Sequence, residues 1–148
     1  MRHSFYLEID PPTATAQERK VSVRSGRVHF YNPDSVKYAK ELLTLELSLH
    51  RPSRYLEGAV KLDVEWRFRA RTHKPGWRVT KPDTDNLQKL LKDCMTRCGF
   101  WRDDAQVCFE VVKKMWSRVP GIYITVEEIG EENETRRNLS AQAGRSEN

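Results

Sequence analysis

The clearest pattern in the chain is a strict alternation of apolar and polar side chains over residues 61–71. The apolar positions of this segment are Leu62, Val64, Trp66, Phe68 and Ala70. The polar positions include three arginines, Arg67, Arg69 and Arg71. Because successive side chains of a strand point to opposite faces, a two-residue period predicts a strand with one buried face.

Four shorter segments also have strand-like composition. Residues 4–9 predict an opening strand that ends at Asp10-Pro11-Pro12, because proline supplies no backbone donor to a ladder. Residues 20–24 and 27–31 surround Ser25-Gly26 and predict a hairpin. Residues 107–115 and 122–128 surround Pro120-Gly121 and predict a second, terminal hairpin.

Two segments have the period of an amphipathic helix. The first begins after Asn32-Pro33-Asp34, where Asn suits the cap and Pro the first helical position, and ends before residue 51. Its apolar stripe is Val36, Ala39, Leu42, Leu43 and Leu47. The second spans residues 86 to about 98 and ends at Gly99. Its apolar stripe is Leu87, Leu90, Leu91, Cys94 and Cys98. These elements predict an α+β fold, a small sheet packed by two main helices.

Composition limits the partners of this fold. The 148 residues include 26 Lys or Arg and 21 Asp or Glu, a net charge of +5 that favours a phosphate-rich partner. This length suits a single domain, expected over residues 1–130, and residues 131–148 are expected to form a polar, disordered tail. Residues 72–82 predict a basic, acid-free loop suited to phosphates. Trp77 in that loop could stack on the bases of a nucleic-acid partner or pack into the core.

Several chemistries receive no support from the residues. Three cysteines without zinc-ligand spacing predict buried thiols, not a disulfide or zinc site. No phosphate-binding P-loop, dinucleotide fingerprint or nucleophile elbow is present, so no organic cofactor is expected. His73, in the basic loop, is expected at the surface or on a phosphate. No apolar run approaches the roughly 18 residues that a membrane span needs, so a soluble cytoplasmic protein is expected.

Acidic residues gather between positions 83 and 104. They are Asp83, Asp85, Asp93, Asp103 and Asp104. Two carboxylates separated by one residue at a helix entrance can point to one side, and oxygen ligands suit Mg²⁺. The alternative is that these acids only cap helices. Lys89 projects from the first turn and could hold a phosphate, or it could form a surface pair with Asp85 four residues earlier.

Two stretches of the chain closely resemble the signature of the RusA family of Holliday junction resolvases. They are Lys-Pro-Asp-Thr-Asp-Asn-Leu-Gln-Lys at residues 81–89 and Cys-Gly-Phe-Trp-Arg-Asp-Asp-Ala-Gln-Val at residues 98–107. The match keeps the D-x-D-N-x-x-K spacing, the G-[FV]-W-x-D-D-x-Q-V block and the distance between them. The basic loop is longer than in compact family members, and residues 13–27 match only in character.

The resemblance implies a set of roles. Asp83, Asp85 and Asp104 would bind Mg²⁺ or Mn²⁺, and Lys89 would be required for cleavage. Beyond the resemblance, we expect Asp103 to be an auxiliary ligand or to orient one, and Asn86 to cap the helix or donate to a ligand. The resemblance also implies a mixed sheet, a homodimer, and a bacterial or prophage-encoded protein that acts at the nucleoid.

The resulting functional prediction is a Mg²⁺-dependent endodeoxyribonuclease that resolves four-way DNA junctions by paired symmetric nicks in recombination and repair. The expected DNA contacts are Arg67, Arg69, Arg71, Lys74, Arg78, Lys81, Arg19, Lys20, Arg24 and Arg27. Two alternatives stay open. One is a metal-dependent nuclease that prefers flaps or forks, and the other is a non-catalytic DNA-binding module whose acids are caps.

Overall fold

The computed structural model describes residues 1–15, 20–24, 26–31 and 34–130. In chain order, its elements are β1 (Arg2–Leu7), β2 (Lys20–Arg24), β3 (Arg27–Tyr31), α1 (Asp34–Ser48), β4 (Val60–Arg69), β5 (Gly76–Trp77), α2 (Thr84–Cys98), the short 3₁₀ helix η1 (Asp104–Gln106), β6 (Val107–Ser117) and β7 (Gly121–Glu128). No helix among the described residues is long and apolar enough to span a membrane.

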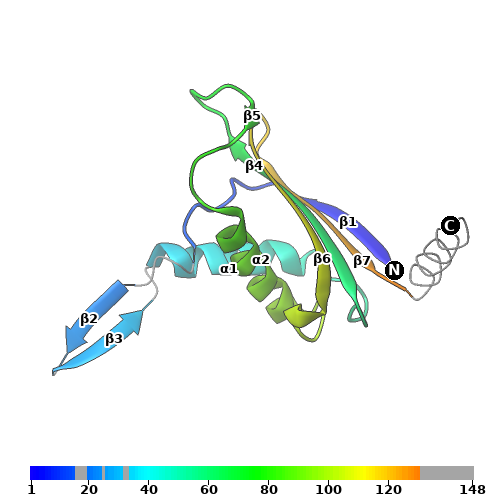
Figure 1. Cartoon of the computed structure of the whole chain (residues 1–148), viewed down its shortest axis with the longest axis horizontal. Helices are drawn as coiled ribbons and strands as arrows, with labels where there is room; N and C mark the ends of the chain where they lie inside the picture. The colour runs from blue at the N-terminus through cyan, green and yellow to red at the C-terminus, as the bar shows by residue number, and fades with distance from the viewer. Residues whose placement is uncertain (16–19, 25, 32–33, 131–148) are drawn as a thin grey trace, which may run out of the picture.

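Five of the strands form one mixed sheet in the order β1-β7-β4-β6-β5. β4 is the central strand, and it pairs in parallel with β6 and antiparallel with β7. Both helices lie on the same side of this sheet (Figure 1). A mixed sheet with two helices on one face confirms the predicted α+β fold.

The predicted terminal hairpin is wrong. β6 and β7 exist and are joined around Pro120, but they do not pair, because β4 lies between them. β4 has an apolar face that is buried along its whole length, and it gains hydrogen bonds on both edges in this position. The connection between β6 and β7 also contacts β1. The Tyr6 hydroxyl donates to the Pro120 carbonyl at 2.6 Å, and a Cβ at Gly121 would lie 2.0 Å from that hydroxyl.

The alternation in β4 determines where the core lies. Leu62, Val64 and Trp66 are fully buried against the helices, whereas the residues between them are partly exposed on the other side of the sheet. The α2 stripe predicted from the sequence is buried, and Leu42 of the α1 stripe is only half-buried. α2 ends at Gly99, whose φ of 79° is left-handed and favours glycine.

The predicted hairpin of β2 and β3 is confirmed as an antiparallel pair that forms its own two-stranded sheet. In Figure 1 it extends beyond the end of α1, away from the five-stranded sheet. Arg19, Ser25, Asn32, Pro33 and the tail at 131–148 lie outside the described residues. So do the side chains of Lys20, Arg24 and Arg27.

The segment predicted as a basic loop, residues 72–82, contains one element of regular structure. β5 pairs Gly76 and Trp77 with Trp116 and Met115 of β6, which extends the sheet beyond the helices (Figure 1). Trp77 is 67% exposed, so the core-packing alternative for this side chain is excluded.

Candidate active site

A groove lies between α2 and β6 on the helix-bearing side of the sheet. Its volume is about 540 Å³. It is lined by Thr84, Asp85, Gln88, Lys89, Lys92, Asp104, Glu110 and Val112. The groove therefore brings together two of the predicted metal ligands, Asp85 and Asp104, with the predicted catalytic lysine, Lys89.

Asp85 and Lys89 are both exposed side chains of the first turns of α2. The alternative of a surface pair between them is not realised, because none of the ion pairs within the described residues joins the two. Lys89 thus presents its ammonium group to the groove without a carboxylate partner in the described part of the chain. A cation in this position can receive a phosphate.

Asp83 occupies the N-cap position of α2, but its side chain makes no capping hydrogen bond. The predicted helix start at residue 86 is therefore two residues late, and Asn86 lies inside the first turn and is not the cap. Asp83 is exposed and does not line the groove. A carboxylate at an N-cap that does not cap weakens the alternative that this acid is only structural.

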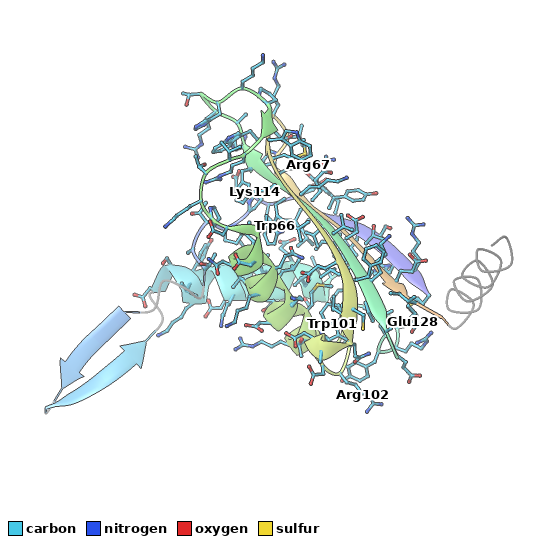
Figure 2. All side chains as sticks on the ribbon, viewed as in Figure 1. Trp66, Arg67, Trp101, Arg102, Lys114 and Glu128 are labelled. Carbon is cyan, nitrogen blue, oxygen red and sulfur yellow. The ribbon has the colours of Figure 1, made fainter. Side chains whose placement is uncertain are left out.

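The turn that leads into Asp83 is held by two cations. Lys114 of β6 donates its ammonium group to the carbonyls of Thr80, at 2.6 Å, and Pro82, at 2.8 Å. Arg78 donates to the carbonyl of Lys81 between them. Burial lowers the pKa of Lys114, and nearby Arg78 adds to this, while Asp83 raises it. Figure 2 shows Lys114 at the end of the sheet near the start of α2.

The floor of the groove is a hydrogen-bonded row of side chains. Gln88, only 3% exposed, accepts from the Trp66 indole at 2.7 Å and donates to Glu110 at 2.8 Å. Lys92 donates to the other Glu110 oxygen at 3.2 Å. Because both oxygens of Glu110 are engaged, this carboxylate contributes negative charge to the groove while its position stays fixed.

Asp103 and Asp104 have different local roles. Asp103 caps η1, and its carboxylate accepts from the Ala105 amide at 2.8 Å. Gln106 completes this capping box by accepting from the backbone of Asp103, at 3.2 Å, and it donates to the carbonyls of Leu56 and Gly58. Asp104 follows the cap and is thereby placed where it lines the groove. Asp103 and Asp93 line a neighbouring hollow together with Asp104.

The predicted ligands do not form a complete cage within one chain. Among residues 1–15, 20–24, 26–31 and 34–130, no three His, Cys, Asp or Glu side chains are close enough to hold one metal ion together. Cys94 and Cys98 are buried on α2 as predicted, and their thiols donate to the carbonyls of Lys40 and Thr44. Burial raises the pKa of both thiols, which suits a packing role. The prediction of a buried thiol is wrong for Cys108 of β6, which is exposed.

The predicted DNA contacts whose side chains are described lie in three places. Arg67 lies on the helix-free face of the sheet, where Glu65 pairs with it at 2.9 Å. Arg69, Arg71 and Arg78 line a cleft at the end of β4. Lys74 and Lys81 are exposed in the loop that connects β4 to α2. The structure therefore divides these side chains among the helix-free face, the cleft and the loop.

Four groove or turn residues were missed from the sequence: Gln88, Lys92, Glu110 and Lys114. A signal for two of them was present in β6. Glu110 and Lys114 alternate along β6 with Val112 and Trp116, so all four side chains lie on the same, helix-facing side of the strand. Two charged groups therefore stand among the apolar side chains of that side. A charge at a position that alternation assigns to the buried face indicates a hydrogen-bonded or functional role.

Comparison with known proteins identifies the class. The sequence profile of the endodeoxyribonuclease RusA family matches residues 10–127, so the chain belongs to this family of nucleases. It is 31% identical over 131 residues to YqaN of Bacillus subtilis, which covers 80% of this chain and 91% of YqaN. It is 28% identical over 133 residues to the crossover junction endodeoxyribonuclease RusA of Lactococcus phage r1t, 87% of this chain and 100% of that protein. The Escherichia coli K12 enzyme of the same name is 40% identical over 74 residues, 49% and 60% of the two chains.

Proposed function

We propose that this protein is a Mg²⁺-dependent endonuclease, with Mn²⁺ as a substitute, that resolves four-way DNA junctions in recombination and repair. The observation that carries the proposal is the groove in which Asp85, Asp104 and Lys89 come together from α2 and η1. Relatives named crossover junction endodeoxyribonucleases support the choice of substrate. We assign this activity to residues 1–130.

The donor set of the groove fits Mg²⁺. Asp85 and Asp104 offer carboxylate oxygens, and they make no ion pair among the described residues. Mg²⁺ commonly takes one or two protein carboxylates and fills its remaining positions with water and substrate phosphate. For this ion, two available acids beside a lysine are therefore a more suitable site than a closed cage of protein ligands would be. When bound, the ion supplies an activated water and compensates charge on the reacting phosphate.

The protein's own residues would divide the remaining work. Asp85 and Asp104 would hold the ion, with Asp83 as a third acid at the entrance to α2. Lys89 would contact the scissile phosphate or orient the attacking water. Asp103 would act as an auxiliary group through its fixed position in the cap of η1. Lys114 would keep the turn before Asp83 in place.

Paired symmetric nicks require two active sites related by a two-fold axis, so we propose that the protein acts as a homodimer. A second copy could also add ligands, since no three His, Cys, Asp or Glu side chains of the described residues are close enough to hold one ion together. Phosphate contacts from the basic side chains predict that the logarithm of the affinity falls steeply with the logarithm of the salt concentration. A flat salt dependence would contradict this electrostatic part of the proposal.

The decisive experiment compares three DNA substrates. A synthetic four-way junction, a linear duplex and a flap are each incubated with the full chain, in Mg²⁺ or in EDTA. We expect paired, symmetric nicks on the junction in Mg²⁺ and no cutting in EDTA. Asp83→Asn should bind the junction as well as or better than the unaltered chain but should not cut it.

The other outcomes would overturn the proposal in distinct ways. Comparable cutting of flaps or duplexes would indicate a nuclease with another substrate. Retention of the junction without any cutting would indicate a binding module. Cutting by Asp83→Asn at an undiminished rate would remove Asp83 from the site.

A further inference from the structure

A second concave surface lies at the end of β4, outside the groove. Its volume is about 310 Å³, enough for a small ligand such as one nucleotide. It is lined by Asp10, Pro11, Thr13, Phe68, Arg69, Arg71, Thr72, His73, Arg78 and Trp116. Three arginines and a histidine against one aspartate make this cleft basic.

Two of the arginines have donors available to an anion, although Arg78 also donates one N–H to the carbonyl of Lys81. Arg69 is paired with Asp10 at 3.1 Å, but no ion pair within the described residues involves Arg71 or Arg78. The Nε of Arg78 is buried and has no hydrogen-bond partner in the described structure. Burial also lowers the pKa of Arg78, because its charge is poorly hydrated. A buried cationic donor without a partner favours the binding of an anion.

Planar groups stack in the same cleft. The guanidinium carbon of Arg78 lies 4.3 Å from the ring centroids of both Phe68 and Trp116. His73 stacks on Trp116 with centroids 3.9 Å apart and an angle of 7° between the rings. His73 is exposed, so its ring can extend this stack by one more planar group. Aromatic rings next to cations are typical of surfaces that hold single-stranded nucleotides.

The cleft and the groove lie along one strand. Val112 lines the groove and Trp116 lines the cleft, and both side chains are on the helix-facing side of β6. Four residues at about 3.3 Å each separate them by roughly 13 Å. One DNA strand rises about 3.4 Å per nucleotide, so this span equals about four nucleotides. Lys114 lies between the two surfaces on the same side of β6.

We propose that the cleft binds one nucleotide of the junction strand, within about four nucleotides of the scissile phosphate. Arg71 and Arg78 receive its phosphate, and the exposed His73 ring stacks on its base. This inference rests on the proposed junction-cleaving function, since it defines the position in terms of the cut.

The test is a scan of four-way junctions in which single phosphates are replaced by neutral methylphosphonates, one to six nucleotides on either side of the cut. Binding is measured in EDTA by gel shift, so it does not depend on cleavage. With the unaltered chain, we expect a methylphosphonate at one position within about four nucleotides of the cut to lower the affinity for the junction roughly tenfold. With Arg71→Gln, that particular loss should shrink to less than about twofold.

Matched variants separate a specific contact from general electrostatics. Lys113→Gln removes a positive charge from the opposite face of the same strand, and it should leave the scan unchanged. His73→Ala should reduce the penalty of an abasic site at the same nucleotide. Both His73 and Arg71 are exposed, so these variants should fold.

Two results would overturn the inference. One is a scan with Arg71→Gln that is identical to that of the unaltered chain. The other is an equal reduction of all penalties, which would mean that Arg71 acts only through long-range charge. If the junction is bound and scanned as expected but never cut, the proposed cleavage fails while the nucleotide contact stands. If the junction is cut but neither scan changes, only the cleft assignment fails.

Discussion

Carboxylates at two places in the fold, the end of β7 and the groove beside α2, have very different surroundings. Glu128, at the end of β7, accepts from Arg54 at 2.6 and 3.1 Å and from the Glu57 amide at 3.0 Å. The Arg54 hydrogen bonds, with the Glu57 amide next in importance, lower the pKa of Glu128 to about 2. Asp85 and Asp104 in the groove make no ion pair among the described residues. Lys114, beside the turn before Asp83, and Glu128 lie toward opposite ends of the sheet (Figure 2).

This difference distinguishes acids that stabilise from acids that are available for chemistry. A carboxylate whose oxygens are already engaged lowers the free energy of the folded state and has little capacity left for a ligand. Carboxylates without partners contribute little to stability, and they remain available to bind a cation. The two places should therefore respond in opposite ways to the same Asp or Glu to amide substitution.

Among the substitutions that compare these two places, Asp85→Asn has the largest expected effect. If Asp85 holds Mg²⁺ as proposed, replacing its carboxylate by an amide should lower the rate of junction cleavage by about a thousandfold, or about 4 kcal/mol of transition-state stabilisation. Junction binding should be unchanged or tighter, because one negative charge near the phosphates is lost. Single-turnover cleavage and gel-shift binding measure the two quantities separately.

Asp63→Asn is the matched control for this substitution. Asp63 is a carboxylate of β4 on the helix-free face of the sheet, so its removal should leave the cleavage rate within about twofold. Equal losses for both variants would mean that cleavage depends on overall charge and not on the groove.

The next effect concerns the support of the groove by Lys114. Lys114→Met keeps the length of the side chain but removes both hydrogen bonds to the turn before Asp83. We expect cleavage to fall by about 10- to 100-fold and the Mg²⁺ concentration for half-maximal rate to rise, since misplacing a ligand weakens ion binding. Lys113→Met, on the opposite face of β6, should change neither quantity.

Lys114→Arg tests whether position or charge matters. Partial recovery of the rate with a near-normal Mg²⁺ requirement is expected from an arginine that can still donate to the carbonyls of Thr80 and Pro82. If Lys114→Met cuts normally at low Mg²⁺, Lys114 does not position the acids.

Most elements of the fold could be predicted because they follow from local patterns. The alternation of residues 61–71 and the two helical stripes specify buried faces directly, and the glycine at position 99 marks the end of α2. The pairing of β6 and β7 could not be predicted in the same way. A short connection around Pro120 favours a hairpin locally, but the choice of partner depends on which strand buries the most apolar surface, and β4 is that strand.

The residues of the candidate site could be predicted from the sequence where they share a local segment or a recognisable motif. Asp83, Asp85 and Lys89 share one helix entrance, and Asp104 belongs to a block that resembles a known signature. Gln88, Glu110 and Lys114 depend on the approach of β6 to α2, which is a property of the sheet order. The sequence does show that Glu110 and Lys114 occupy the same alternating positions of β6 as Val112. It does not show that α2 covers this side of the strand, so their role could not be assigned.

The effect of Mg²⁺ on the free energy of unfolding should differ between a substitution in the groove and a substitution at Glu128. Mg²⁺ at about ten times its dissociation constant should raise the free energy of unfolding by about 1.4 kcal/mol, because it binds only the folded chain. Asp85→Asn should lose this increment, and Glu128→Gln should retain it. Urea unfolding with and without Mg²⁺ measures the increment, and its survival in Asp85→Asn would separate ion binding from Asp85.

The smallest effect is that of Glu128→Gln. An amide cannot reproduce the charged hydrogen bonds to Arg54, so the free energy of unfolding at pH 7 should fall by about 1 kcal/mol, with cleavage unchanged. The folded-state pKa is depressed from 4.5 to about 2, so this contribution is complete above about pH 4.5 and is lost as pH falls toward 2. Urea midpoints of the two chains should therefore converge between pH 4.5 and 2. A gap that persists at pH 2 would mean that Glu128 acts through packing, in which case its contrast with the groove acids would not be electrostatic.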